Sequence, residues 1–152
     1  MQPAANPALT ALEPLLGDWR LEVSGAAFLP SPDAVTTLQV HAAWVQHGAA
    51  LMLSHDPSPG APAGPPASTF LIGRDDDASD FTALYSDERG VSRVYAMSLH
   101  GRDWQIRREA PHFAQRFQAT IAEDGATITG SWRKSIDGDV WEHDMDFRYI
   151  RV

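Results

Sequence analysis

The chain has 152 residues, 43% of them hydrophobic and 21% charged, which is typical of one globular domain. Its 12 basic and 20 acidic residues give a net charge of −8, which opposes binding to nucleic acid or to an anionic membrane. The absence of cysteine excludes disulfides and cysteine-ligated metal centres. With no membrane-spanning apolar run and no signal peptide, we expect a cytoplasmic protein and a single domain over residues 1–152.

A short helical segment is predicted at the start of the chain. Asn6 is a favourable N-cap, and Pro7 suits the first helical position. Leu9 and Leu12 follow at helical spacing, and Gly17 ends the segment. We therefore expect a small helical cap before the first strand.

From Trp19 onward, apolar residues recur at every second position, which is typical of half-buried strands. Turns containing glycine separate these runs. The expected strands span residues 18–25, 35–46, 49–55, 68–74, 80–86, 91–99, 103–109, 114–122, 126–136 and 139–151. About ten short strands without a long helix predict an all-β fold, either an antiparallel up-and-down β-barrel or a sandwich. Closure leaves no exposed strand edge, which favours the barrel.

The segment 57–66 differs from the rest, because it holds five of the 11 prolines. Such a composition predicts a loop between two strands rather than a domain linker. Two interpretations stay open: a tolerated surface insertion, or a lid over one mouth of the barrel.

The residues Gly17-Asp18-Trp19 open the first strand directly after the helical cap. In that position they resemble the Gly-x-Trp signature of lipocalins and related calycin barrels. The resemblance implies that Trp19 closes one end of the barrel, with a basic residue of the last strand over its ring. Arg151 is the best match for that residue, and a guanidinium over an indole is a favourable contact.

A wider resemblance is to an uncharacterised bacterial family of small calycin-like proteins. It is carried by residues 72–76 (IGRDD), 84–95 (LYSDERGVSRVY), 115–117 (QRF), 132–135 (WRKS) and 149–152 (YIRV). That family has no known function, so the resemblance implies a fold and no activity. A more distant similarity to nitrobindin-type haem-binding barrels implies an inward histidine near the C-terminus, a place that His143 would take.

His143 is the most informative candidate in the sequence. Strict alternation places it on one apolar row of the last strand, between Trp141 and Met145, and therefore inside the barrel. Three roles stay open: a hydrogen-bonded core histidine, a ligand contact or general base, and an axial ligand of haem iron. Apart from that haem alternative, we expect no cofactor.

Further ligand-binding candidates are expected on the inner face of the barrel. With His143, they are Tyr85, Tyr95, Met97, Arg108, Trp132 and Trp141. Arg108 is expected to point inward in the row of Trp104 and Ile106, where it would hold a ligand carboxylate or an acidic side chain. His41, His47 and His55 are expected to be scattered surface or rim histidines, so we predict no metal site.

The function favoured by these observations is the binding of a small, largely apolar molecule inside the barrel. One alternative is a hydrolase, isomerase or cyclase acting on a hydrophobic metabolite, with His143 as general base. Others are a haem protein and a solid-cored barrel that acts through its surface on a protein partner. The sequence leaves open whether the interior is a cavity or a filled core, and whether the chain forms a homodimer.

Overall fold

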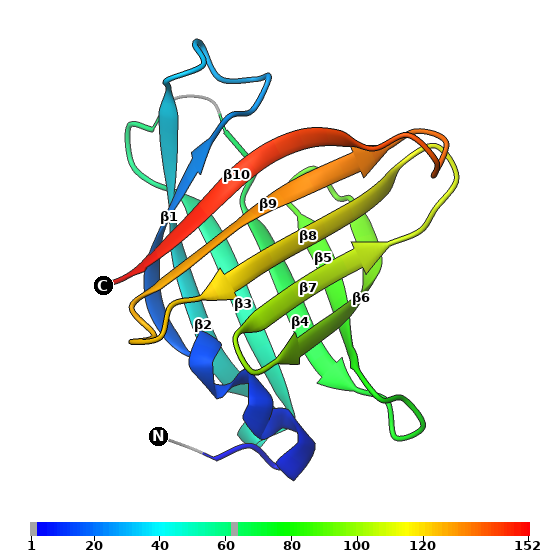
Figure 1. Cartoon of the computed structure of the whole chain (residues 1–152). Helices are drawn as coiled ribbons and strands as arrows, with labels where there is room; N and C mark the ends of the chain where they lie inside the picture. Colours follow the sequence, from blue (N-terminus) through cyan, green and yellow to red (C-terminus); the bar gives the residue numbers. More distant parts are fainter. Residues whose placement is uncertain (1–2, 62–63) are drawn as a thin grey trace.

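The computed structural model describes residues 3–61 and 64–152. Within these, ten antiparallel strands close into a barrel in which each strand pairs with its neighbour in sequence and the last pairs with the first (Figure 1). The strands are β1 (Gly17–Ser24), β2 (Val35–Val45), β3 (Ala50–Pro57), β4 (Ser68–Arg74), β5 (Phe81–Asp87), β6 (Ser92–His100), β7 (Asp103–Arg108), β8 (Ala114–Ile121), β9 (Thr127–Ser135) and β10 (Glu142–Arg151). The predicted all-β barrel is confirmed.

Local sequence explains why these strands form and where they turn. Buried and exposed residues alternate along β8, as expected for a strand with one face toward the core. Gly90 and Gly101 have positive φ values of 79° and 62° in the turns that follow β5 and β6. Only glycine adopts such angles without steric cost, so these positions fix the sites of chain reversal.

One end of the barrel is closed by the N-terminal helix η1 (Pro7–Leu15), which lies across it (Figure 1). The Asn6 side chain caps this helix by accepting a hydrogen bond from the backbone N–H of Ala8 at 2.9 Å. The helix is of the 3₁₀ type, with three residues per turn, so Leu9, Leu12 and Leu15 align on one face and are buried. The predicted helical cap is therefore confirmed, with a tighter winding than an α-helix.

The contact between Trp19 and Arg151 anchors this closed end. Arg151 lies opposite Trp19 in the β1–β10 pairing, with its guanidinium carbon 3.9 Å from the centre of the indole ring. Its nitrogens donate to the carbonyl oxygens of Leu16 at 2.6 Å and Pro14 at 3.0 Å. The indole N–H donates to the Leu15 carbonyl at 2.9 Å. The predicted cation–π pair is confirmed, and it ties both ends of the chain to η1.

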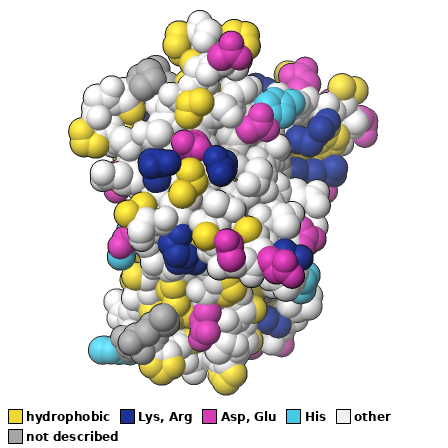
Figure 2. All heavy atoms as spheres, turned by 60° about the vertical axis from the view of Figure 1, so that its left-hand side comes forward, with side chains coloured by type: hydrophobic (Ala, Val, Ile, Leu, Met, Phe, Trp, Pro, Cys, Tyr) yellow, Lys and Arg dark blue, Asp and Glu magenta, His cyan; other side chains and the backbone are white. Residues whose placement is uncertain are grey.

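Charges of both signs are interspersed on the face shown in Figure 2. On the outer surface of β1 and β10, Glu22 lies 3.7 Å from both Arg20 and Arg148. Such exposed pairs contribute little stability each.

No helix in the described residues is both long enough and apolar enough to cross a membrane.

Candidate functional site

The end of the barrel opposite η1 contains a cavity of about 380 Å³. Its walls come from inward-facing strand residues, and its mouth is bordered by the connections after β1, β3, β5 and β7. The other half of the interior is filled by side chains such as Trp104, Met97 and Leu12, each at most 1% exposed. The barrel therefore has a packed half and a hollow half.

Aromatic rings form a large part of the cavity wall. Phe70 of β4 contacts Tyr85 of β5 with ring centres 5.2 Å apart, and Tyr95 of β6 contacts Trp132 of β9 at 6.0 Å. Phe147 of β10 continues the series, 6.4 Å from Trp132. Mutual packing of these rings at steep angles gives the cavity a rigid apolar lining.

A buried polar pair lies beside the cavity, and His55 is the member that lines it. His55 of β3 and Tyr149 of β10 are 4% exposed each, and Nε2 of His55 lies 3.0 Å from the Tyr149 hydroxyl oxygen. This is the one hydrogen bond of the hydroxyl among the described residues, and the tautomer of the imidazole decides which of the two groups donates. Nδ1 is buried and has no hydrogen-bond partner. Burial lowers the pKa of His55 to about 4 and raises that of Tyr149, so both groups are neutral at physiological pH.

The expectation that His55 lies at the surface or rim is wrong. Leu51, Leu53 and His55 occupy alternate positions of β3, so all three point into the barrel. The two leucines were the available signal in the sequence. His41, by contrast, is exposed and pairs with Asp18 at 2.6 Å on the outer surface.

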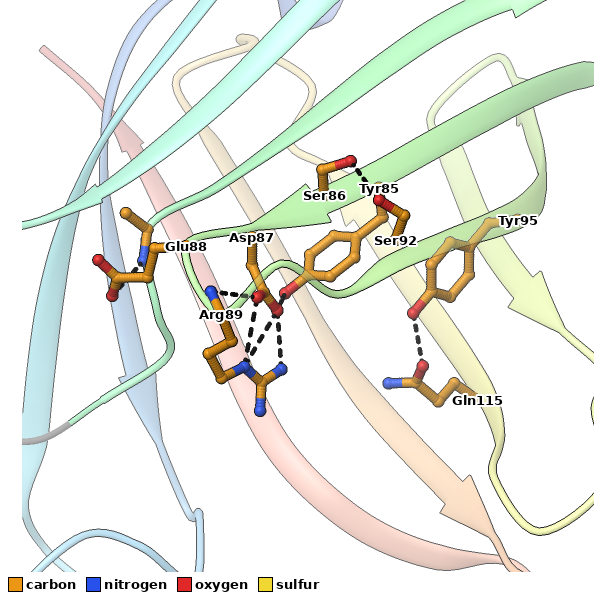
Figure 3. Close-up of polar contacts among 9 residues, drawn as sticks. Tyr85, Ser86, Asp87, Glu88, Arg89, Ser92, Tyr95 and Gln115 are labelled. Carbon is orange, nitrogen blue, oxygen red and sulfur yellow. Dashed lines mark hydrogen bonds and ion pairs between the residues drawn. The ribbon is translucent and has the colours of Figure 1, made fainter.

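A polar cluster lies at the mouth where β5 turns into β6 (Figure 3). Asp87 accepts hydrogen bonds from the Tyr85 hydroxyl at 2.7 Å and from the Arg89 guanidinium at 2.7 Å. The hydrogen bond from Arg89 is the main reason that the pKa of Asp87 lies far below its usual range. Burial and the hydrogen bond to Asp87 raise the pKa of Tyr85. Asp87 thus stays ionised, and it orients both Tyr85 and Arg89 toward the cavity.

A second polar contact spans the cavity wall. The Tyr95 hydroxyl donates to Oε1 of Gln115 on β8, and both residues are at most 7% exposed. Burial raises the pKa of Tyr95, while a hydrogen bond and the positive charge of Arg93 act in the opposite direction. Arg93 also lies over the Phe113 ring, 5.0 Å from its centre. Arg93, Gln115 and Phe113 all line the cavity.

The mouth is flanked by apolar residues of two connections. Phe28, between β1 and β2, lines the cavity although it is 46% exposed. Gly64, Pro65 and Pro66, at the end of the proline-rich segment 57–66, line it from the other connection. This segment is therefore next to the mouth, where a lid would have to lie; residues 62 and 63 are outside the described range.

The predicted inward orientation of His143 and Trp141 is wrong. The β10–β9 register shifts between His143 and Met145, which face Arg133 and Trp132 respectively, so Asp144 is an extra residue in a β-bulge. The bulge reverses the alternation, so His143 lies outside, 2.9 Å from Asp146. A hydrogen bond from His143 is the main cause of the lowered pKa of Asp146.

The other predicted residues divide between the cavity and its surroundings. Tyr85, Tyr95 and Trp132 line the cavity as expected. Arg108 does not line it, because its guanidinium turns to donate to the Phe113 carbonyl at 2.9 Å. Met97 is fully buried in the packed half. Trp141 lies under Arg116 on the outer surface, with the guanidinium carbon 3.9 Å from the ring centre.

The chemistry assigned to His143 does not fit this geometry. A general base or an axial haem ligand must face the cavity, and the His143 ring is outside it. The inward positions of β10 near the cavity are held by Met145, Phe147 and Tyr149 instead. No group of three or more His, Asp or Glu side chains in the described part of the chain is placed to hold a metal ion.

Comparison with known proteins supports the fold but identifies neither a family nor a function. No protein-family model matches the chain, and no curated protein matches it. Among solved structures, it is similar to the crystal structure of Rv2717c from M. tuberculosis, with a TM-score of 0.61 and 16% identity over 97% of this chain and 98% of that chain. The ten-stranded barrel fits a calycin-like fold, whereas no match supports the bacterial family or the nitrobindin similarity.

Proposed function

We propose that this protein binds one small, largely apolar molecule inside the barrel. The observation that carries the proposal is the cavity of about 380 Å³ with its wall of packed aromatic rings. Ligand sites of proteins are concave, mostly apolar and have a few placed polar groups, and this cavity has each of these properties. Each 100 Å² or so of apolar ligand surface removed from water contributes roughly 2.5 kcal/mol to binding.

The binding site is preorganised. The rings are held by contacts with one another, and the barrel is closed on all sides by strand pairing. Little side-chain order has to be created when a ligand enters, which favours affinity. The hydroxyls of Tyr85 and Tyr95 are already hydrogen-bonded to Asp87 and Gln115, so an apolar guest does not leave these two hydroxyls without a partner.

The test is a fluorescence titration with a neutral dye, N-phenyl-1-naphthylamine, which brightens in an apolar environment. We expect saturable binding with one dye per chain. The variant Ser68→Trp places a large ring in the cavity from the inner face of β4, opposite His55. It should weaken dye binding at least about tenfold.

The matched control is Leu71→Trp on the outer face of the same strand, where Leu71 is 38% exposed. It adds the same ring outside the cavity and should leave dye binding unchanged. Absence of saturable binding to the wild type, or equal binding by the Ser68→Trp variant, would contradict the proposal.

A further inference from the structure

The charges around the cavity do not balance. Arg89 is neutralised by Asp87 at 2.7 Å, and Asp144 lies 3.5 Å from Lys134. Arg93 also lines the cavity, but no carboxylate of the described residues lies within ion-pair distance of it. On a chain with net charge −8, one uncompensated guanidinium therefore remains at the mouth of an apolar cavity.

Hydrogen-bond donors converge beside that charge. The Tyr95 hydroxyl donates to Oε1 of Gln115, which turns the amide nitrogen of Gln115 away from Tyr95 (Figure 3). That nitrogen has no acceptor among the described residues, and Gln115 lines the cavity. Arg93 and Tyr95 lie two residues apart on β6 and both line the cavity, so the guanidinium and the Tyr95–Gln115 pair border the same space. Arg93 and Gln115 thus offer hydrogen-bond donors and one positive charge, and no unpaired carboxylate of the described residues lies beside them.

Such a group is complementary to an oxyanion. A guanidinium presents parallel N–H donors that match the two oxygens of a carboxylate, and a charge-assisted hydrogen bond is stronger than a neutral one. One cation balances the single charge of a carboxylate, whereas the second charge of a phosphate would stay unpaired beside an apolar cavity, and burying an unpaired charge is costly. The aromatic wall, from Phe70 to Phe147, would then receive the apolar part of the molecule.

We propose that the ligand is an amphipathic monocarboxylate whose carboxylate is held at the mouth by Arg93 and Gln115, with its apolar body in the aromatic half of the cavity. This inference rests on the proposed function, since it names the chemical class of the molecule bound there. Asp87 is a positioning residue in this arrangement, because it neutralises Arg89 and leaves Arg93 as the unpaired cation.

The experiment measures displacement of the neutral dye at neutral pH by three probes with the same alkyl chain: decanoate, 1-decanol and decyl phosphate. Wild-type protein should bind decanoate at least about tenfold more tightly than 1-decanol. Arg93→Met keeps an unbranched side chain over Phe113 and should abolish this preference, whereas Arg93→Lys should retain part of it. Arg107→Met, an exposed residue of β7, is the control and should keep the full preference.

Each result has a defined meaning because the preference is a ratio measured within one variant. Failure of the wild type to bind the dye would overturn the proposed function and this inference with it. Dye binding with equal affinity for decanoate and 1-decanol would overturn the inference alone, as would a preference that survives in Arg93→Met. Tighter binding of decyl phosphate than of decanoate would overturn the inference and indicate a phosphate ester as the ligand class.

Discussion

The Tyr149 hydroxyl lies 3.0 Å from Nε2 of His55, and this contact joins β10 to β3 across the interior of the barrel. The two strands are not hydrogen-bonded neighbours, so the pair is a cross-barrel link. Burial disfavours the charged form of both side chains. The link therefore makes stability depend on pH.

We expect the free energy of unfolding to fall as the pH is lowered from about 6.5 to about 4. The pKa of His55 is about 4 in the folded protein and 6.5 in the unfolded chain. The unfolded chain therefore binds the proton more tightly in this pH interval. The stabilisation is complete above pH 6.5 and is lost progressively toward pH 4. Between pH 7 and pH 4.5 the loss from this group is about 2.5 kcal/mol.

The measurement is urea denaturation of the wild type and of His55→Gln at these two pH values. Glutamine retains a polar partner for Tyr149 but does not titrate. Carboxylates such as Asp87 and Asp146 titrate in both proteins, so the difference between the two pH dependences isolates His55. Parallel pH dependences would show that His55 does not titrate in this way.

Replacement of Arg151 by methionine should destabilise the protein by about 1–3 kcal/mol. The variant loses the cation over Trp19 and the hydrogen bonds to the carbonyls of Pro14 and Leu16. Lysine keeps the charge but cannot reproduce the planar fork of donors, so Arg151→Lys should recover only part of the loss. Thermal unfolding followed by tryptophan fluorescence measures both. The control is Arg20→Met, where a single exposed ion pair is removed; an equal effect there would refute the anchoring role.

Substitution of His143 by alanine should leave dye and decanoate binding unchanged, because the ring is on the outer surface with Asp146. Stability should decrease by at most about 1 kcal/mol, since the pair is half exposed and Asp146 keeps its hydrogen bond from Ser131. The measurement is the dye titration with the decanoate competition. A tenfold or larger loss of affinity, on the order of 1.4 kcal/mol, would show that His143 belongs to the binding site.

The strands were predictable because alternation is a local signal. Leu51, Leu53 and His55 share one face by sequence spacing alone, and the same rule places Tyr85 and Tyr95 inside. The Gly-x-Trp resemblance gave the partner of Trp19 correctly. These features need no knowledge of which strand lies beside which.

The misplacement of His55 overlooked this local signal, whereas the other errors arise where the neighbouring strand determines the structure. The bulge at Asp144 depends on how β10 pairs with Trp132 and Arg133 of β9, and no residue type in β10 predicts it. A shift by one residue then moved His143 to the opposite face. The contact between Tyr95 and Gln115 also joins strands that are not adjacent, so spacing could not reveal it.

Gly130 should be intolerant of even one added methyl group. A Cβ atom at this position of β9 would collide with the Gln118 carbonyl oxygen and with Ala119 on β8. Because the obstacle includes backbone, the strands must separate locally, and we expect Gly130→Ala to cost about 1–3 kcal/mol of stability in urea denaturation. Gly73 of β4 is the matched control, since a Cβ there meets no atom within 4 Å. Gly73→Ala should be neutral or stabilising by up to about 1 kcal/mol, because alanine restricts the unfolded chain. Equal effects of the two substitutions would mean that β8 and β9 are not packed this closely.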